Sequence, residues 1–114
     1  MDSIFCFKFN DITGKVTRIE ISEYRIQVNA STGKKTYLFA NTITQEGSNY
    51  RVSEDKFDRF VSNKVFSFDD SYSHAYRVMK DDLEEAIGRL EREYKRKQSL
   101  LALYWLNKAF DDRK

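Results

Sequence analysis

The chain has 114 residues, a formal net charge of +2 and charged side chains at 33% of its positions. Nine phenylalanines and seven tyrosines provide enough apolar surface for a hydrophobic core, so an intrinsically disordered chain is excluded. Cys6 is the only cysteine, which excludes an intrachain disulfide and favours a reducing compartment. The first residues lack a signal-peptide pattern, and no apolar run approaches the roughly 18 residues of a membrane span. We therefore expect a soluble protein of the cytoplasm.

The first part of the chain is typical of β-strands. Residues 4–9 alternate so that three phenylalanines share one face. Residues 15–28 form a second strand-like segment, but the alternation of apolar residues changes phase within it. We expect a bulge or corner at Ser22 and Glu23, and therefore a strongly bent sheet. Turn residues separate this segment from a third predicted strand at 35–44.

The next segment favours a short helix. After a loop at 45–49 and a short strand at 50–52, Ser53 has the chemistry of a helix N-cap and acidic residues follow it. Three apolar side chains are spaced to bury one side of a helix at 54–62. Asn63 can end that helix in the left-handed conformation. Residues 65–68 then predict a last strand.

The final third of the chain predicts one long helix. Ser71, preceded by two aspartates, supplies an acceptor for the first free N–H groups. Steps of three and four residues place large apolar side chains on one helix face. This stripe comprises Tyr72, Tyr76, Met79, Leu83, Ile87, Leu90, Tyr94, Leu101 and Trp105.

These elements predict an α+β fold: a small bent antiparallel sheet with one short helix, followed by a long C-terminal helix. Residues 1–68 would form the β-rich body, and residues 69–114 the helix, which packs on the body and on a partner. An unbroken helix of this length would measure about 60 Å, whereas a body of this size would be about 25–30 Å across. Part of the apolar stripe therefore needs another molecule to cover it. The polar residues 95–99 leave open whether the helix bends there.

The primary prediction from this excess apolar surface is a non-enzymatic protein-binding module. A homodimer through the C-terminal helix or a host protein would cover the stripe. The residues predicted to bind protein are Tyr94, Leu101, Tyr104, Trp105 and Phe110.

No pattern in the chain points to catalysis, a metal, a cofactor or a small-molecule substrate. His74 is the only histidine, with Asp69 and Asp70 as neighbours in sequence, and one histidine and one distant cysteine do not make a zinc site. We interpret Cys6 as a small buried apolar residue and not as a reactive thiol. We expect no enzyme activity.

The alternative function is nucleic-acid binding. Basic residues gather on the helix and, more sparsely, on the predicted sheet, where the candidates are Arg18, Arg25, Lys34 and Lys35. Cations of this kind bind phosphates, and an aromatic sheet face can stack bases. The helical residues predicted to bind nucleic acid are Arg89, Arg92, Lys95, Arg96 and Lys97.

The opening aromatic strand, the segment 15–24, the run from Phe57 to Phe68 and the charged helix together resemble small proteins of bacteriophages and mobile elements. This group includes anti-CRISPR and other anti-defence inhibitors. The resemblance implies a protein that occupies a surface of a host defence protein, such as a CRISPR effector, in the cytoplasm of a bacterial host. It assigns no role to any residue.

Overall fold

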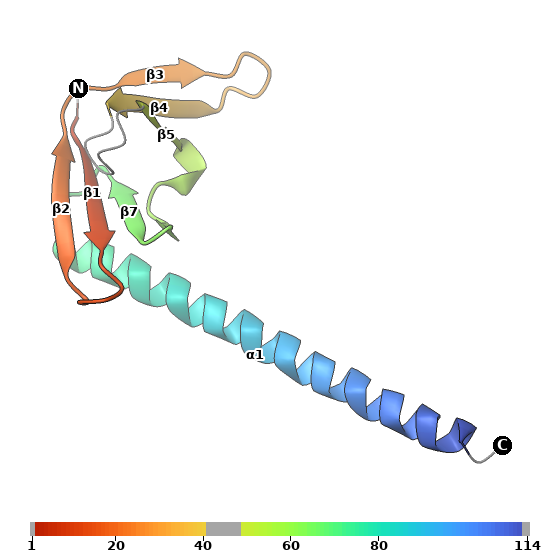
Figure 1. Cartoon of the computed structure of the whole chain (residues 1–114). Coiled ribbons are helices and arrows are strands. Elements are labelled where there is room, and N and C mark those ends of the chain that lie inside the picture. The colour runs from red at the N-terminus through yellow and green to blue at the C-terminus, as the bar shows by residue number, and fades with distance from the viewer. Residues whose placement is uncertain (1, 41–48, 113–114) are drawn as a thin grey trace. The chain divides into compact units, whose positions relative to one another are not determined.

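The computed structural model describes residues 2–40 and 49–112. The chain divides into two compact units, Met1–Asp82 and Leu83–Lys114. Two small antiparallel sheets and one long helix make up the described elements, which confirms the predicted α+β class (Figure 1). The first unit contains both sheets and the first turns of the helix, and the second consists of the rest of the helix.

The first sheet has four antiparallel strands in the order β2-β1-β7-β6. Phe7 of β1 lies opposite Arg18 of β2 on one side and Val65 of β7 on the other. The predicted alternation along β1 is confirmed by this register. The strands are β1 (Ile4–Phe9), β2 (Val16–Ile21), β6 (Phe60–Val61) and β7 (Lys64–Ser67).

The second sheet has three antiparallel strands in the order β3-β4-β5. These are β3 (Arg25–Val28), β4 (Lys35–Ala40) and β5 (Asn49–Ser53). The predicted corner at Ser22 and Glu23 is present, but it takes the chain from one sheet into another instead of bending a single sheet. The predicted third strand is described only to Ala40, and its remaining residues, 41–44, lie outside the described part.

One hydrophobic cluster joins the two sheets. Its buried members are Ile4, Cys6, Ile21, Tyr24, Tyr37, Phe39, Val52 and Phe66. Tyr37 on β4 lies at its centre, with ring centroids 4.9 Å from Phe57, 5.7 Å from Tyr24 and 5.7 Å from Phe68. The even-numbered residues Ile4 and Cys6 of β1 thus pack on this side of the first sheet.

A second cluster covers the opposite face of the first sheet. Phe7 and Val65 are fully buried there against Ala75 and Met79, which come from the first turns of helix α1 (Tyr72–Asp111). Phe5 and Phe9 pack at the edge of this cluster. The first sheet is therefore buried on both faces. The alternation of residues 4–9 predicted an aromatic lining for one face only, so it did not predict the burial of the other face.

The helix predicted at 54–62 is corrected to a three-residue 3-10 turn, η1 (Glu54–Lys56). Ser53 makes no side-chain capping hydrogen bond. The apolar residues that suggested a helix face lie in two different clusters. Phe57 packs in the inter-sheet cluster, and Phe60 packs in the cluster under the helix. The left-handed conformation predicted for Asn63 is present (φ 61°), but it forms the turn between β6 and β7.

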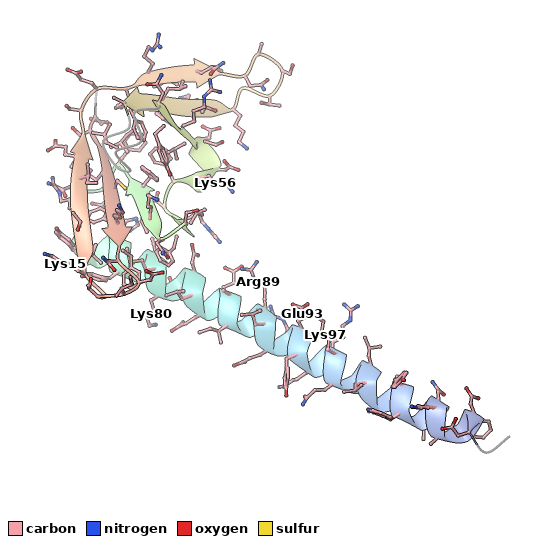
Figure 2. All side chains as sticks on the ribbon, viewed as in Figure 1. Lys15, Lys56, Lys80, Arg89, Glu93 and Lys97 are labelled. Atoms are coloured by element: carbon pink, nitrogen blue, oxygen red, sulfur yellow. The ribbon has the colours of Figure 1, made fainter. Side chains whose placement is uncertain are left out.

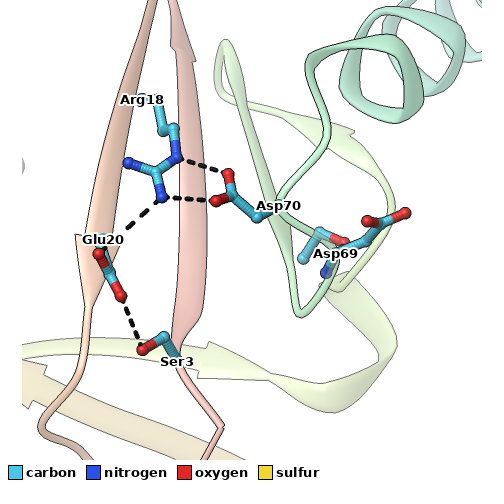
Figure 3. A network of polar contacts seen from close by, with 6 residues as sticks. Ser3, Arg18, Glu20, Asp69 and Asp70 are labelled. Atoms are coloured by element: carbon cyan, nitrogen blue, oxygen red, sulfur yellow. Dashed lines mark hydrogen bonds and ion pairs between the residues drawn. The ribbon is translucent and has the colours of Figure 1, made fainter.

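Helix α1 begins as predicted, with Ser71 as its N-cap. The Ser71 Oγ atom accepts a hydrogen bond of 3.2 Å from the backbone N–H of His74. Just before the helix, Asp70 accepts two hydrogen bonds from the Arg18 guanidinium, at 2.5 and 2.7 Å, so that β2 anchors the approach to the helix (Figure 3). Glu20 continues this network to Ser3.

The Arg18 contact makes stability depend on pH. The hydrogen bond and charge of Arg18 lower the pKa of Asp70, so the carboxylate stabilises the fold above its ordinary pKa of about 4 and this contribution is lost as pH falls through the lowered value. We expect Asp70→Asn to lower the Tm at pH 7, and we expect this difference to shrink progressively as pH falls below about 4. Thermal unfolding by circular dichroism at a series of pH values measures this. Asp69→Asn is the matched control, and an equal effect there would contradict the assignment.

The helix is continuous through residues 95–99, so the bend left open by the sequence does not occur. From Leu83 to Phe110, the large apolar side chains of the second unit are 48–66% exposed. Among the residues described, no helix is both long and apolar enough to cross a membrane.

Candidate nucleic-acid interface

Three arginines share one face of the second unit. Arg89, Arg92 and Arg96 follow one another at spacings of three and four, which places them within an arc of about 60° on an α-helix. All three are exposed. Among the described residues, neither Arg92 nor Arg96 forms an ion pair. This arginine face is a row of cations on a rigid element.

Gly88 lies beneath the arginine face. A Cβ atom placed on Gly88 would lie 3.4 Å from Nη1 of Arg92, so the guanidinium of Arg92 turns back over the glycine. A side chain at position 88 would come into close contact with the flexible end of Arg92. The helix continues through Gly88 without interruption, although glycine costs about 1 kcal/mol relative to alanine there.

The two lysines of the predicted basic patch differ in their relation to the arginine face. Lys97 forms an ion pair of 3.0 Å with Glu93, one helical turn earlier (Figure 2). Both side chains are well exposed, so the pair contributes little to stability, about 0.3–0.5 kcal/mol. At about 100° per residue, Lys95 lies about 60° from Arg92, at the edge of the arginine face, whereas Lys97 lies about 140° from Arg92. Lys95 therefore borders the arginine row, and only Lys97 is separated from it.

The residues predicted to bind protein fall on two faces. Tyr94, Leu101, Tyr104 and Trp105 lie near the line of Leu83, Ile87 and Leu90, opposite the arginine face. Tyr104 packs edge-on against Trp105 at 5.3 Å, and the Lys108 ammonium lies 5.3 Å from the Trp105 ring. Phe110 instead continues the arginine side together with Leu103 and Leu106.

The basic residues predicted on the sheets separate into paired and unpaired groups. Arg18 is held by Asp70, and Lys34 forms an ion pair of 3.0 Å with Asp55. Arg25 lies directly opposite Leu38, and Leu38 lies opposite Arg51 on the next strand. Arg25 and Arg51 therefore flank Leu38 on the face of the second sheet that points away from the inter-sheet cluster.

Sequence reasoning missed Arg51 and two lysines that share a hollow with it. This hollow, of about 150 Å³, is lined by Arg51 of β5, Lys56 of η1 and Lys64 of β7, with Ser53 and Ser62 between them. Lys64 donates a hydrogen bond of 3.3 Å to the Ser62 carbonyl. The three cations lie close together in the sequence, between residues 51 and 64, on β5, η1 and β7, and the fold brings these three elements to one hollow. Their closeness in the sequence was the signal that could have found them.

The residues considered for catalysis have structural partners. His74 Nε2 lies 2.7 Å from Oδ1 of Asp58, in the loop before β6, and not beside Asp69 or Asp70. This contact ties the loop to the first turn of the helix. Further along the helix, Asp82 accepts a hydrogen bond of 2.7 Å from the Phe60 N–H of β6. Burial raises the pKa of the Cys6 thiol to about 12, so the thiolate that reacts or binds metal is strongly disfavoured. In the described ranges, no cluster of three or more His, Cys, Asp or Glu is placed to hold a metal.

Comparison with known proteins gives one informative similarity. The chain is 30% identical over 99 residues to a probable replication protein, rep, of Bifidobacterium longum strain NCC 2705. The alignment covers 82% of this chain and 32% of that protein, so the chain spans about a third of the length of its relative. No family model matches the chain. No solved structure matches it either.

Proposed function

We propose that the chain is a replication-associated, non-enzymatic module of a mobile genetic element that binds the phosphate backbone of nucleic acid through Arg89, Arg92 and Arg96. The similarity to a replication protein supports a role on nucleic acid. It gives no support to an inhibitor of a host defence protein. The observation that carries the proposal is the row of three exposed arginines on one helix face.

Arginine suits this task because its planar guanidinium is always charged and can donate two parallel hydrogen bonds to one phosphate. The row from Arg89 to Arg96 spans seven residues, or about 10 Å along the helix axis, which is enough to meet more than one phosphate. Neutralising phosphates releases counterions, so this binding is sensitive to salt.

The fold favours backbone contacts over base stacking. The aromatic side chains of β1 pack in the cluster under the helix, so this sheet face is not available to stack on bases. On the second sheet, Arg25 and Arg51 and the hollow that Arg51 shares with Lys56 and Lys64 offer further phosphate contacts. Contacts of this kind position a nucleic acid without reading its sequence.

The direct test is fluorescence anisotropy with labelled single-stranded and duplex DNA of random sequence at low salt. We expect binding to both, and a loss of roughly tenfold in affinity for each reversed arginine in the variant Arg92→Glu/Arg96→Glu. Such a loss would place the phosphates on the arginine face.

A control with the same net charge separates this face from general electrostatic attraction. Lys15→Glu/Arg77→Glu reverses two exposed cations outside the arginine face. We expect this variant to bind within about threefold of the unmodified protein, since distant charges are screened. Equal losses in the two double variants, or no binding by the unmodified chain, would overturn the proposal.

A further inference from the structure

A regular seam of side chains runs along the second unit, opposite the arginine face. Its members alternate in spacing between four and three residues, the pattern of a coiled-coil seam. The seam comprises Leu83, Ile87, Leu90, Tyr94, Lys97, Leu101, Tyr104 and Lys108. It is a property of the second unit alone.

The seam is solvent-exposed along its length. Leu90 and Tyr94 are each 65% exposed, and Leu101 and Tyr104 are 55% and 54% exposed. Scattered apolar residues on a surface are ordinary, but a regular row of this length, interrupted only by Lys97 and ending at Lys108, is typical of an interaction surface. A second copy would satisfy it because a heptad repeat is complementary to itself.

The two lysines in the seam decide how a second copy can pair. In a parallel pair, each seam residue faces its own counterpart, so Lys97 would face Lys97 and Lys108 would face Lys108 across the apolar seam. Like charges in contact there are unfavourable. A parallel pair is therefore disfavoured by this sequence.

An antiparallel pair removes both conflicts. If Leu90 faces Leu101 of the second copy, then Tyr94 faces Lys97, Ile87 faces Tyr104, and Leu83 faces Lys108. Lysine stems can cover apolar surface while their ammonium groups reach solvent, and Lys97 would lie beside a tyrosine ring, a favourable cation–π arrangement. In this register every seam residue from 83 to 108 has a partner.

The charge along the helix agrees with the antiparallel direction. Residues 83–93 carry four glutamates and two arginines, whereas residues 94–108 carry four basic residues and no acidic ones. An antiparallel pair brings the acidic segment of one copy to the basic segment of the other. It also opposes the two helix dipoles.

From the spacing, exposure and charge of the seam, we infer that two copies of this chain associate through an antiparallel coiled coil of residues 83–108, with Leu90 of each copy against Leu101 of the other. The arginine face lies on the outside of this pair, opposite the seam. The dimer seam and the phosphate-binding arginines therefore lie on different faces of the helix. Either proposal can be correct if the other is wrong.

Cysteine cross-linking tests both the partner and the direction. Leu90→Cys and Leu101→Cys chains, one of them with a size tag, are mixed in a glutathione redox buffer. Both sites are exposed in the single chain, so neither change should disturb the fold, and the unmodified protein controls for buried Cys6. We expect a disulfide between the two variants when they are mixed, and no disulfide in either variant alone.

The reason is geometric. In the antiparallel pair, Leu101 of one copy lies about 16 Å along the axis from Leu101 of the other, whereas a disulfide needs Cα atoms within about 7 Å. Disulfides formed by Leu101→Cys alone would show a parallel pair and overturn the inference. A monomer in sedimentation velocity at high protein concentration, together with no cross-link in the mixture, would also overturn it.

Discussion

Replacing Phe7 by alanine is expected to lower the free energy of unfolding by about 3–5 kcal/mol. Phe7 is fully buried, and its ring packs edge-on against Tyr72 at 5.3 Å. It also lies in one cluster with Ala75 and Met79. The truncation would leave a cavity where the helix meets the first sheet, so both the sheet and the start of the helix would lose packing contacts.

Urea unfolding followed by circular dichroism at a single protein concentration measures this loss. Phe7→Leu is the matched variant, since it keeps most of the apolar volume, and we expect it to cost about 1–1.5 kcal/mol. A loss below about 1 kcal/mol for Phe7→Ala would show that this cluster does not hold the helix to the sheet.

Replacing Tyr37 by alanine is expected to cost about 3 kcal/mol, because this ring joins the two sheets. It contacts the rings of Tyr24, Phe57 and Phe68, which come from three different parts of the chain. No other described ring has contacts of this kind with all three. The inter-sheet cluster would lose its centre.

The same urea experiment measures the Tyr37 effect, with Tyr37→Phe as the control. That variant keeps the ring contacts and removes only the hydroxyl, so we expect it to stay within about 0.5 kcal/mol of the unmodified protein. If Tyr37→Phe were as destabilising as Tyr37→Ala, the hydroxyl and not the ring packing would hold the sheets together.

The strands and the helix could be predicted because their signals are local. Alternation identified β1, and steps of three and four with Ser71 as N-cap identified the helix and its start. The phase change near Ser22 located the corner. The strand pairing after the corner depends on residues outside this segment. Nothing in residues 15–28 shows that β3 pairs with β4 in a separate sheet.

The segment 54–62 misled the prediction for a physical reason. Phe57, Phe60 and Val61 have helical spacing, but pairing with β7 satisfies the backbone of residues 60 and 61 instead. The Asp58 N–H donates to the Phe66 carbonyl, and the Phe60 N–H donates to the Asp82 carboxylate. These acceptors are distant in the sequence, so local propensity could not include them.

The candidate interface was predicted in part. The five basic helix residues were named from the sequence, but their division into an arginine face and two lysines follows from the continuity of the helix across 95–99. On the sheets, Arg18 and Lys34 were poor candidates because carboxylates hold them. Arg51 lies opposite Leu38 only because β4 pairs with β5.

The salt dependence of DNA binding tests the central claim most directly. We expect the logarithm of the binding constant to fall linearly with the logarithm of salt concentration, by about 0.7 per phosphate contacted on a single strand. In Arg92→Glu/Arg96→Glu this slope should become shallower by about 1.5, because two contacts are lost. Binding that does not change with salt, or the same slope in both proteins, would contradict the account.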